Sequence, residues 1–167
     1  GVVLSLLGLW ITLALLPKPP LLEKVPFSQA IYDRNGNLLR LSLAPDEKYR
    51  LYLPLSSLSP SVIQAALLHE DRFFRYHPGV NPISLGKALW KSYISHDFTM
   101  GASTLTMQVA RLRYNLHTRS LWGKAKQLFL AVQLEYHYSK DEILEAYFNL
   151  APYGQNIEGV GAASLIY

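Results

Sequence analysis

The chain has 167 residues, which is enough for one domain with a hydrophobic core. Its formal net charge of +4 and its pI of about 9.3 predict an anionic partner. It contains no cysteine, which excludes disulfide bonds and thiolate chemistry. The histidines show no HExxH or other ligand spacing, so the sequence predicts no metal site.

The N-terminal residues 1–16 are almost wholly apolar, with Ser5 and Thr12 as the only polar side chains. Because a spanning helix needs about 20 such residues, we expect residues 1–16 to be the C-terminal part of a single-pass membrane anchor. A cleaved signal peptide is the alternative, but no small-x-small cleavage site precedes Pro17. The proline-rich residues 17–28 then predict a linker.

A β-hairpin is predicted next, with strands at 30–33 and 38–41 around an Asn-Gly turn. Residues 49–53 alternate like a short strand. From Ser59 onward the sequence looks helical. The first predicted helix starts after Ser59. Four more are predicted after Asn81 to Ile94, after Ser103 to about Tyr114, after Ser120 to about Tyr138, and after Ser139 to about Asn149. A last helix starts at Ala162. Glycines at 154, 159 and 161 indicate a loop before that final helix.

Glu70 is the candidate catalytic residue. At about 100° per residue, the apolar residues after Ser59 form a stripe roughly 140° wide that extends to Phe73 and Phe74, with Glu70 in its middle. A carboxylate on an apolar face is costly unless it is used or paired. Burial raises its pKa, which suits a general base or acid. A structural core glutamate paired with an arginine explains the same pattern equally well.

A candidate anion site follows at residues 101–108, where small and hydroxyl side chains open a helix whose free N–H groups bind phosphate-like groups. Residues 98–134 contain no Asp or Glu, but they include the cations Arg111, Arg113, Arg119, Lys124 and Lys126. Such a patch fits a diphosphate. A capped amphipathic helix, or a basic face on anionic lipid, explains the same residues. A membrane-anchored chain argues against nucleic acid.

Five segments together resemble the motifs of the peptidoglycan glycosyltransferases of family 51, the module of class A penicillin-binding proteins. Their order and spacing match over about residues 28–167. The segments are Glu70–Gly79, Gly101–Arg111, Arg119–Lys124, Lys140–Asn149 with Tyr153–Gly154, and Gly159–Ser164. The amino-acid sequences at Met107–Leu112 and Ala151–Gly154 look most like those of the 1C type of these proteins.

The resemblance implies a mainly α, lysozyme-like glycosyltransferase fold with a small N-terminal β-hairpin and a jaw subdomain that meets the membrane. The glycosyltransferase domain is then expected at 29–167, incomplete at its C-terminus because the chain stops inside the fifth motif. The resemblance also implies that the catalytic domain lies on the outer face of the bacterial cytoplasmic membrane. Other cell-wall synthesis proteins are its expected partners there.

The reaction implied by the resemblance joins lipid II units to a nascent glycan strand. Glu70 takes the proton of the acceptor 4-hydroxyl, a β-1,4 bond forms with inversion, and undecaprenyl diphosphate leaves. The resemblance leaves room for a divalent cation and implies no other cofactor. The implied substrate-binding residues are Asp71, Phe73, His77, Gly79, Ser103, Thr104, Gln108, Arg111, Arg119, Lys124, Gln127 and Asn149.

Gln127 departs from the family pattern, since many members carry a second glutamate there. A glutamine can hydrogen-bond a phosphate or sugar but cannot carry a charge. Two alternatives stay open at the level of sequence, of which the second is favoured by Gln127 and the incomplete module. One is a peptidoglycan-cleaving enzyme of lysozyme-like fold, and the other is a non-catalytic scaffold that binds lipid II.

Overall fold

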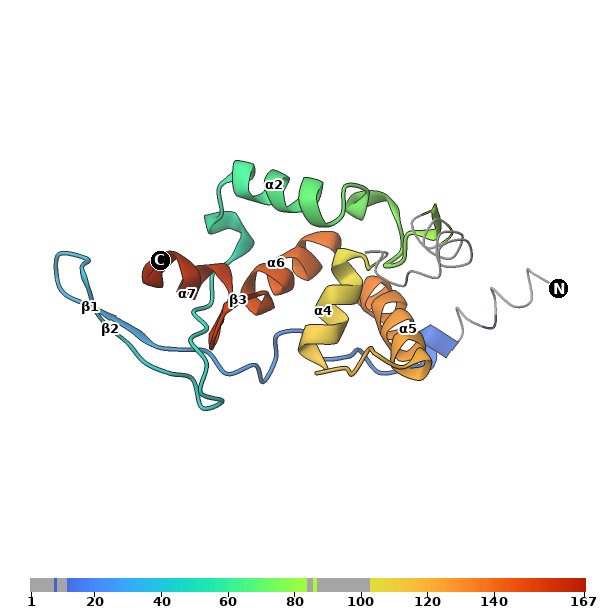
Figure 1. Cartoon of the computed structure of the whole chain (residues 1–167), viewed down its shortest axis with the longest axis horizontal. Helices are drawn as coiled ribbons and strands as arrows, with labels where there is room; N and C mark the ends of the chain where they lie inside the picture. Colours follow the sequence, from blue (N-terminus) through green and yellow to red (C-terminus); the bar gives the residue numbers. More distant parts are fainter. Residues whose placement is uncertain (1–7, 9–11, 84–85, 87–102) are drawn as a thin grey trace.

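The computed structural model describes residues 8, 12–83, 86 and 103–167 (Figure 1). This part of the chain is mainly helical with two small antiparallel sheets, β1–β2 and β3–β4, which confirms the predicted class and the N-terminal hairpin. The elements are β1 Ala30–Tyr32, β2 Leu38–Leu41, the 3-10 helix η1 Leu55–Ser57, α2 Pro60–Glu70, the 3-10 helix η2 Phe74–Tyr76, α4 Leu105–Arg113, α5 Leu121–His137, α6 Lys140–Leu150, β3 Pro152–Gly154, β4 Ile157–Glu158 and α7 Val160–Ile166.

Two predicted elements fall largely outside the described residues. They are the membrane anchor at 1–16 and most of the helix predicted to end at Ile94. Of the helices in the described part of the chain, none has the length and hydropathy needed to cross a membrane.

The core forms where α4, α5 and α6 pack together (Figure 1). Phe74 reaches this core from η2, after α2 has ended. Each large apolar side chain buried here contributes about 1.5–3 kcal/mol relative to exposure. The fully or almost fully buried members include Leu105, Val109, Leu134, Ile143, Leu144 and Phe148.

Helix starts follow the predicted capping residues, with one exception. The hydroxyls of Ser59 and Ser120 accept hydrogen bonds from N–H groups in the first turns of α2 and α5, and Ser139 forms a capping box with Glu142. The predicted cap Ser103 is wrong, because Thr104 caps α4 by accepting from the Met107 N–H. Ser103 lies one residue too early and pairs with Lys124 instead.

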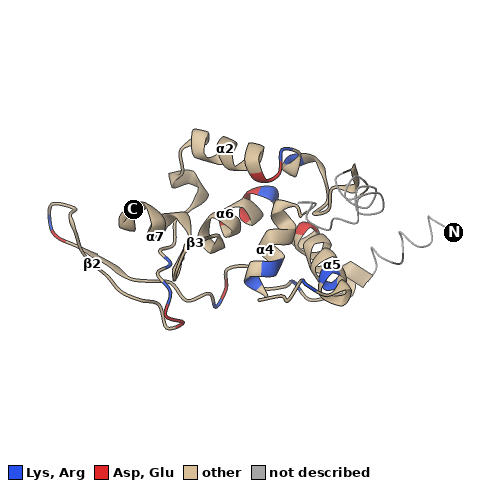
Figure 2. Ribbon diagram, viewed as in Figure 1, with Lys and Arg blue, Asp and Glu red and all other residues tan. Residues whose placement is uncertain are grey.

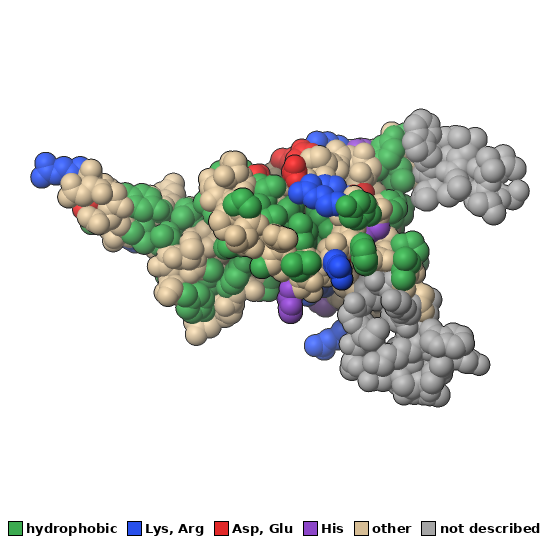
Figure 3. Space-filling view, turned by 90° about the horizontal axis from the view of Figure 1, so that it is seen from above, with side chains coloured by type: hydrophobic (Ala, Val, Ile, Leu, Met, Phe, Trp, Pro, Cys, Tyr) green, Lys and Arg blue, Asp and Glu red, His purple; other side chains and the backbone are tan. Residues whose placement is uncertain are grey.

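The apolar stripe predicted after Ser59 is partly wrong. The backbone leaves the helical conformation at Asp71, so α2 ends at Glu70, and Phe73 is 55% exposed. No residue of α2 is fully buried. Figure 3, which views the molecule from above, shows hydrophobic side chains on this face. Val62 and Leu68 of α2 are both exposed.

The proline-rich segment before the hairpin lies against the helical core. Leu21 is buried in that core. The Tyr138 and Tyr114 hydroxyls donate to the carbonyls of Pro19 (2.7 Å) and Pro20 (2.9 Å). Pro19 and Pro20 lie outside any helix or strand, so side-chain donors satisfy their carbonyls instead of backbone N–H groups.

The strand predicted at 49–53 is wrong. Only Tyr49 forms a bridge there, a parallel one to Ile157, because β4 is two residues long and offers no longer ladder. The glycine-rich stretch predicted as a loop contains the β3–β4 hairpin, and its Gly154 has a φ of 117° that favours glycine.

Candidate active site

Glu70 lies at the C-terminal end of α2, with 29% of its side chain exposed. Its Oε2 accepts a hydrogen bond of 2.7 Å from Gln108 Nε2 on α4. In the described ranges no Arg or Lys lies within ion-pair distance of Glu70, and its one ionisable neighbour at that range is His69, at 3.7 Å. The arginine pairing expected of a structural core glutamate is therefore not seen there.

The negative charge of Glu70 also acts on Tyr147 of α6. Burial, and then the negative charge of Glu70, raise the pKa of the Tyr147 phenol to about 12. The phenol therefore stays neutral near pH 7. Residues of α2, α4 and α6 thus meet around one partly exposed carboxylate.

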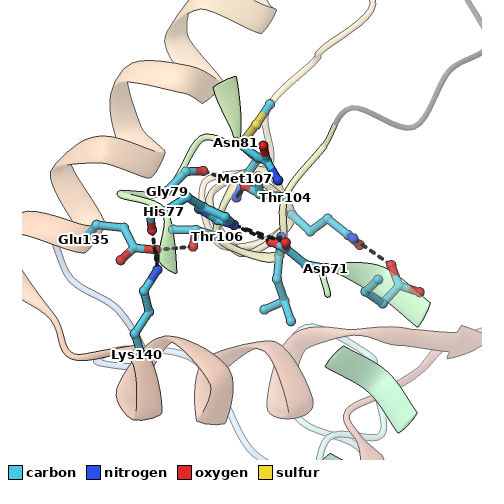
Figure 4. Close-up of polar contacts among 12 residues, drawn as sticks. Asp71, His77, Gly79, Asn81, Thr104, Thr106, Met107, Glu135 and Lys140 are labelled. Atoms are coloured by element: carbon cyan, nitrogen blue, oxygen red, sulfur yellow. Dashed lines mark hydrogen bonds and ion pairs between the residues drawn. The ribbon is translucent and has the colours of Figure 1, made fainter. Parts of the chain in front are cut away.

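Asp71, the residue after Glu70, is held inside the protein (Figure 4). Its buried carboxylate contacts Nε2 of buried His77 at 2.9 and 3.1 Å and accepts from the Leu105 N–H at 3.0 Å. A negative charge is favourable at the N-terminus of α4. The predicted substrate-binding residues Asp71 and His77 therefore have their partners within the fold.

Gly79 and Thr104 connect the turn after η2 to the start of α4 (Figure 4). The buried Thr104 hydroxyl donates to the Gly79 carbonyl at 2.5 Å. The backbone at Gly79 has a φ of 84°, and a Cβ there would lie 2.7 Å from the Ala131 carbonyl oxygen. Only glycine fits this approach to α5.

The structure brings together three of the predicted anion-binding residues. Lys124 Nζ on α5 donates to the Ser103 hydroxyl at 2.9 Å. Burial, and then the nearby positive charge of Arg111, lower the pKa of Lys124. Figure 2 shows the basic residues of α4 and α5. Arg119 is exposed in the turn before α5 and makes no hydrogen bond or ion pair with the other three.

Gln127 and Asn149, also predicted to bind substrate, are buried and bridge elements of the fold. Gln127 Nε2 donates to the Met107 carbonyl at 2.7 Å, while its Oε1 is buried without a partner among the described atoms. Asn149 accepts from the Leu53 N–H at 2.9 Å and donates to the Leu53 carbonyl at 2.8 Å. Gln127 thus fixes α5 to α4, and Asn149 fixes the chain before η1 to α6.

Gln127→Glu should lower the free energy of unfolding by about 2–3 kcal/mol at pH 7, because a carboxylate cannot donate to the Met107 carbonyl and loses its hydration when it is buried. Burial would raise the pKa of the new carboxyl in the folded state. Its protonated form can donate to the carbonyl, so the deficit should shrink as pH falls. Urea unfolding from pH 7 to pH 4 measures this, with exposed Gln64→Glu as the control. A pH-independent deficit, or none, would contradict it.

A polar network that the sequence analysis missed lies beside the Asp71–His77 pair (Figure 4). Glu135 Oε1 on α5 accepts from the Thr106 hydroxyl (2.5 Å) and from Lys140 Nζ (2.7 Å). Lys140 also donates to the His77 carbonyl at 2.6 Å. No sequence pattern indicated that these residues meet, because they come from three helices and the turn after η2. The described residues hold no group of three or more His, Asp or Glu placed to bind a metal ion.

Comparison with known proteins identifies the family of the chain. The transglycosylase family model matches residues 35–167. Penicillin-binding protein 1C of Escherichia coli (strain K12) is 39% identical over 173 aligned residues, which cover 96% of this chain and 22% of that protein. Penicillin-binding protein 1A/1B of Bacillus subtilis (strain 168) is 35% identical over 84% of this chain. Penicillin-binding protein 1A of Escherichia coli (strain K12) is 36% identical over 82%.

The chain spans between 15% and 22% of the length of these three relatives. The family match covers the segment from the hairpin turn to the C-terminal residue, and so includes Glu70, the Ser103–Lys124 pair and the buried residues that support them. The chain therefore belongs to the transglycosylase family.

Proposed function

We propose that this chain is a peptidoglycan glycosyltransferase that polymerises lipid II into β-1,4 glycan strands with inversion. The observation that carries the proposal is the state of Glu70. It is a partly exposed carboxylate held through one oxygen by an amide donor, with no Arg or Lys at ion-pair distance in the described ranges. A carboxylate neutralised by a cation would be a weaker base.

Glu70 acts as the general base in the proposed reaction. Because Gln108 holds Oε2, Oε1 is the oxygen available to the acceptor. It takes the proton of the 4-hydroxyl of the acceptor sugar while that oxygen attacks the anomeric carbon of the growing strand. The bond to undecaprenyl diphosphate breaks as the new bond forms, which inverts the configuration. Asp71 and His77 act indirectly, because they fix the chain after α2 to the start of α4.

Ser103, Arg111 and Lys124 bind the leaving diphosphate in this proposal, and exposed Arg119 approaches it from the turn before α5. Clustered cations offset the charge that develops on the leaving group. Desolvation of Lys124 strengthens its interaction with an anion, since the effective dielectric constant is lower there. The resemblance to family members also supports substrate contacts for Phe73 and Gly79, of which Phe73 is exposed.

The proposed location is the outer face of the bacterial cytoplasmic membrane, with an N-terminal anchor before the domain at 29–167. The support is the apolar sequence of residues 1–16 together with the lipid-linked substrate. Protein partners of cell-wall synthesis belong to the same proposal.

Incubating the chain with labelled lipid II and separating the products tests the function. Appearance of glycan polymer is the expected result. Shortening of preformed glycan without polymer would instead identify a cleaving enzyme, and binding of lipid II with neither product would identify a scaffold.

Lys124→Ala should weaken binding of the lipid-linked diphosphate roughly tenfold at low salt, because a charge-assisted hydrogen bond to phosphate is lost. The difference should narrow as ionic strength rises. Binding measured at two salt concentrations tests this, with exposed Lys126→Ala on the same helix as the matched control. Equal affinities for the two variants would place the diphosphate elsewhere.

A further inference from the structure

We infer that a second pocket, on another side of α4 from Glu70, binds a compact oxyanion of the carboxylate or phosphate type. The cavity has a volume of about 360 Å³. Its walls come from the segment before β1, the turn before Tyr49, and the C-terminal ends of α4 and α6. The lining residues include Lys24, Asp46, Lys48, Arg50, Arg113 and Glu158.

One wall of the pocket is already neutralised. The Arg50 side chain is 4% exposed, and it pairs with Asp46 at 3.1 Å and with Glu158. Lys48 also pairs with Glu158. Arg50 Nη1 donates to the Pro26 carbonyl at 2.6 Å, which fixes the guanidinium in place. Both carboxylates that line the pocket are therefore committed to Arg50 and Lys48.

Two other lining cations, Arg113 and Lys24, have no carboxylate partner in the described ranges. Arg113 donates through Nε to the Leu21 carbonyl (2.5 Å) and through Nη2 to the Glu23 carbonyl (2.7 Å). These carbonyls orient the guanidinium but leave its charge uncompensated. In the described part of the chain, no carboxylate lies within ion-pair distance of Arg113 or Lys24. The pocket therefore has an excess of positive charge on a preorganised frame.

The geometry of α4 separates this pocket from the proposed catalytic site. Residues five positions apart, such as Gln108 and Arg113, point about 140° apart around a helix, and Arg111 and Arg113 point about 160° apart. Gln108 contacts Glu70, and Arg111 acts on Lys124. Arg113 instead contacts the backbone before β1. The cations at the end of α4 therefore serve two different faces.

A small oxyanion fits these features. Arg113 donates through Nε and Nη2 to backbone carbonyls, and among the described residues no acceptor is seen for its Nη1. Nη1 and the exposed Lys24 ammonium are therefore the donors that can bind one phosphate or carboxylate group. A phosphate group or an acidic side chain of a peptide offers this chemistry.

The test is a calorimetric titration of the whole chain with sodium phosphate and, separately, with sodium succinate, both at constant ionic strength. Saturable binding of at least one anion is expected. Lys24→Gln should weaken it roughly three- to fivefold, as loss of one exposed charge does. Among the described residues no acceptor is seen for the Lys24 side chain, whereas Arg113→Gln also releases the carbonyls before β1. Lys24→Gln is therefore the primary variant.

Lys126→Gln is the matched control, since it removes the same charge from an exposed position on α5. Saturation by phosphate alone assigns a phosphate ligand, saturation by succinate alone assigns a carboxylate ligand, and saturation by both supports a general oxyanion site. Absence of saturation overturns the inference. An unchanged affinity in Lys24→Gln, or an equal loss in Lys126→Gln, also overturns it.

Discussion

Glu70→Gln should lower the rate of lipid II polymerisation by about 10²–10⁴-fold, because an amide cannot take the acceptor proton. The fold should persist. The new amide oxygen still accepts from Gln108, and in the described ranges no cation at ion-pair distance loses its partner. Binding of lipid II should also persist, so the loss should appear in kcat.

Glu47→Gln is the control, since it makes the same chemical change at an exposed residue in the turn before Tyr49. It should polymerise lipid II at the rate of the unmodified chain. Thermal unfolding of both variants separates a loss of chemistry from a loss of structure. Turnover near the unmodified rate in a folded Glu70→Gln variant would remove Glu70 from the role of base.

Gly79→Ala should lower the free energy of unfolding by roughly 2–5 kcal/mol, from backbone strain and overpacking together. The backbone φ of 84° disfavours any side chain. The added Cβ would also lie 2.7 Å from the Ala131 oxygen and 2.9 Å from Glu135 Cγ. Backbone atoms of a packed helix cannot move aside cheaply, so the turn after His77 should shift away from α5.

Gly36→Ala separates the two causes. Gly36 has a φ of 85°, but a Cβ there would meet nothing within 4 Å. Gly36→Ala should therefore lower the free energy of unfolding only by the cost of the backbone conformation, about 1–2 kcal/mol. Chemical denaturation of both variants gives the comparison. Equal losses would show that the contact with α5 contributes nothing.

Local signals in the sequence determined most of the helical framework. Ser59, Ser120 and Ser139 mark helix starts because a hydroxyl satisfies free N–H groups within its own turn, which needs no distant partner. The hairpin at 30–41 formed as predicted because its turn chemistry is also local. The role of Glu70 remains a prediction, although its placement on α2 followed from the sequence.

Tertiary structure decided which predicted site residues lie at the surface and which support the fold. Asp71, Gln127 and Asn149 were all expected to bind substrate, yet each is buried and bonded to backbone groups from distant segments. The end of α2 at Glu70 and the exposure of Phe73 depend on how Asp71 reaches α4. The Glu135–Lys140 network and the pocket beside Arg113 arise only when separate segments meet. Periodicity reports one element at a time, whereas burial and long-range hydrogen bonds depend on how several elements pack.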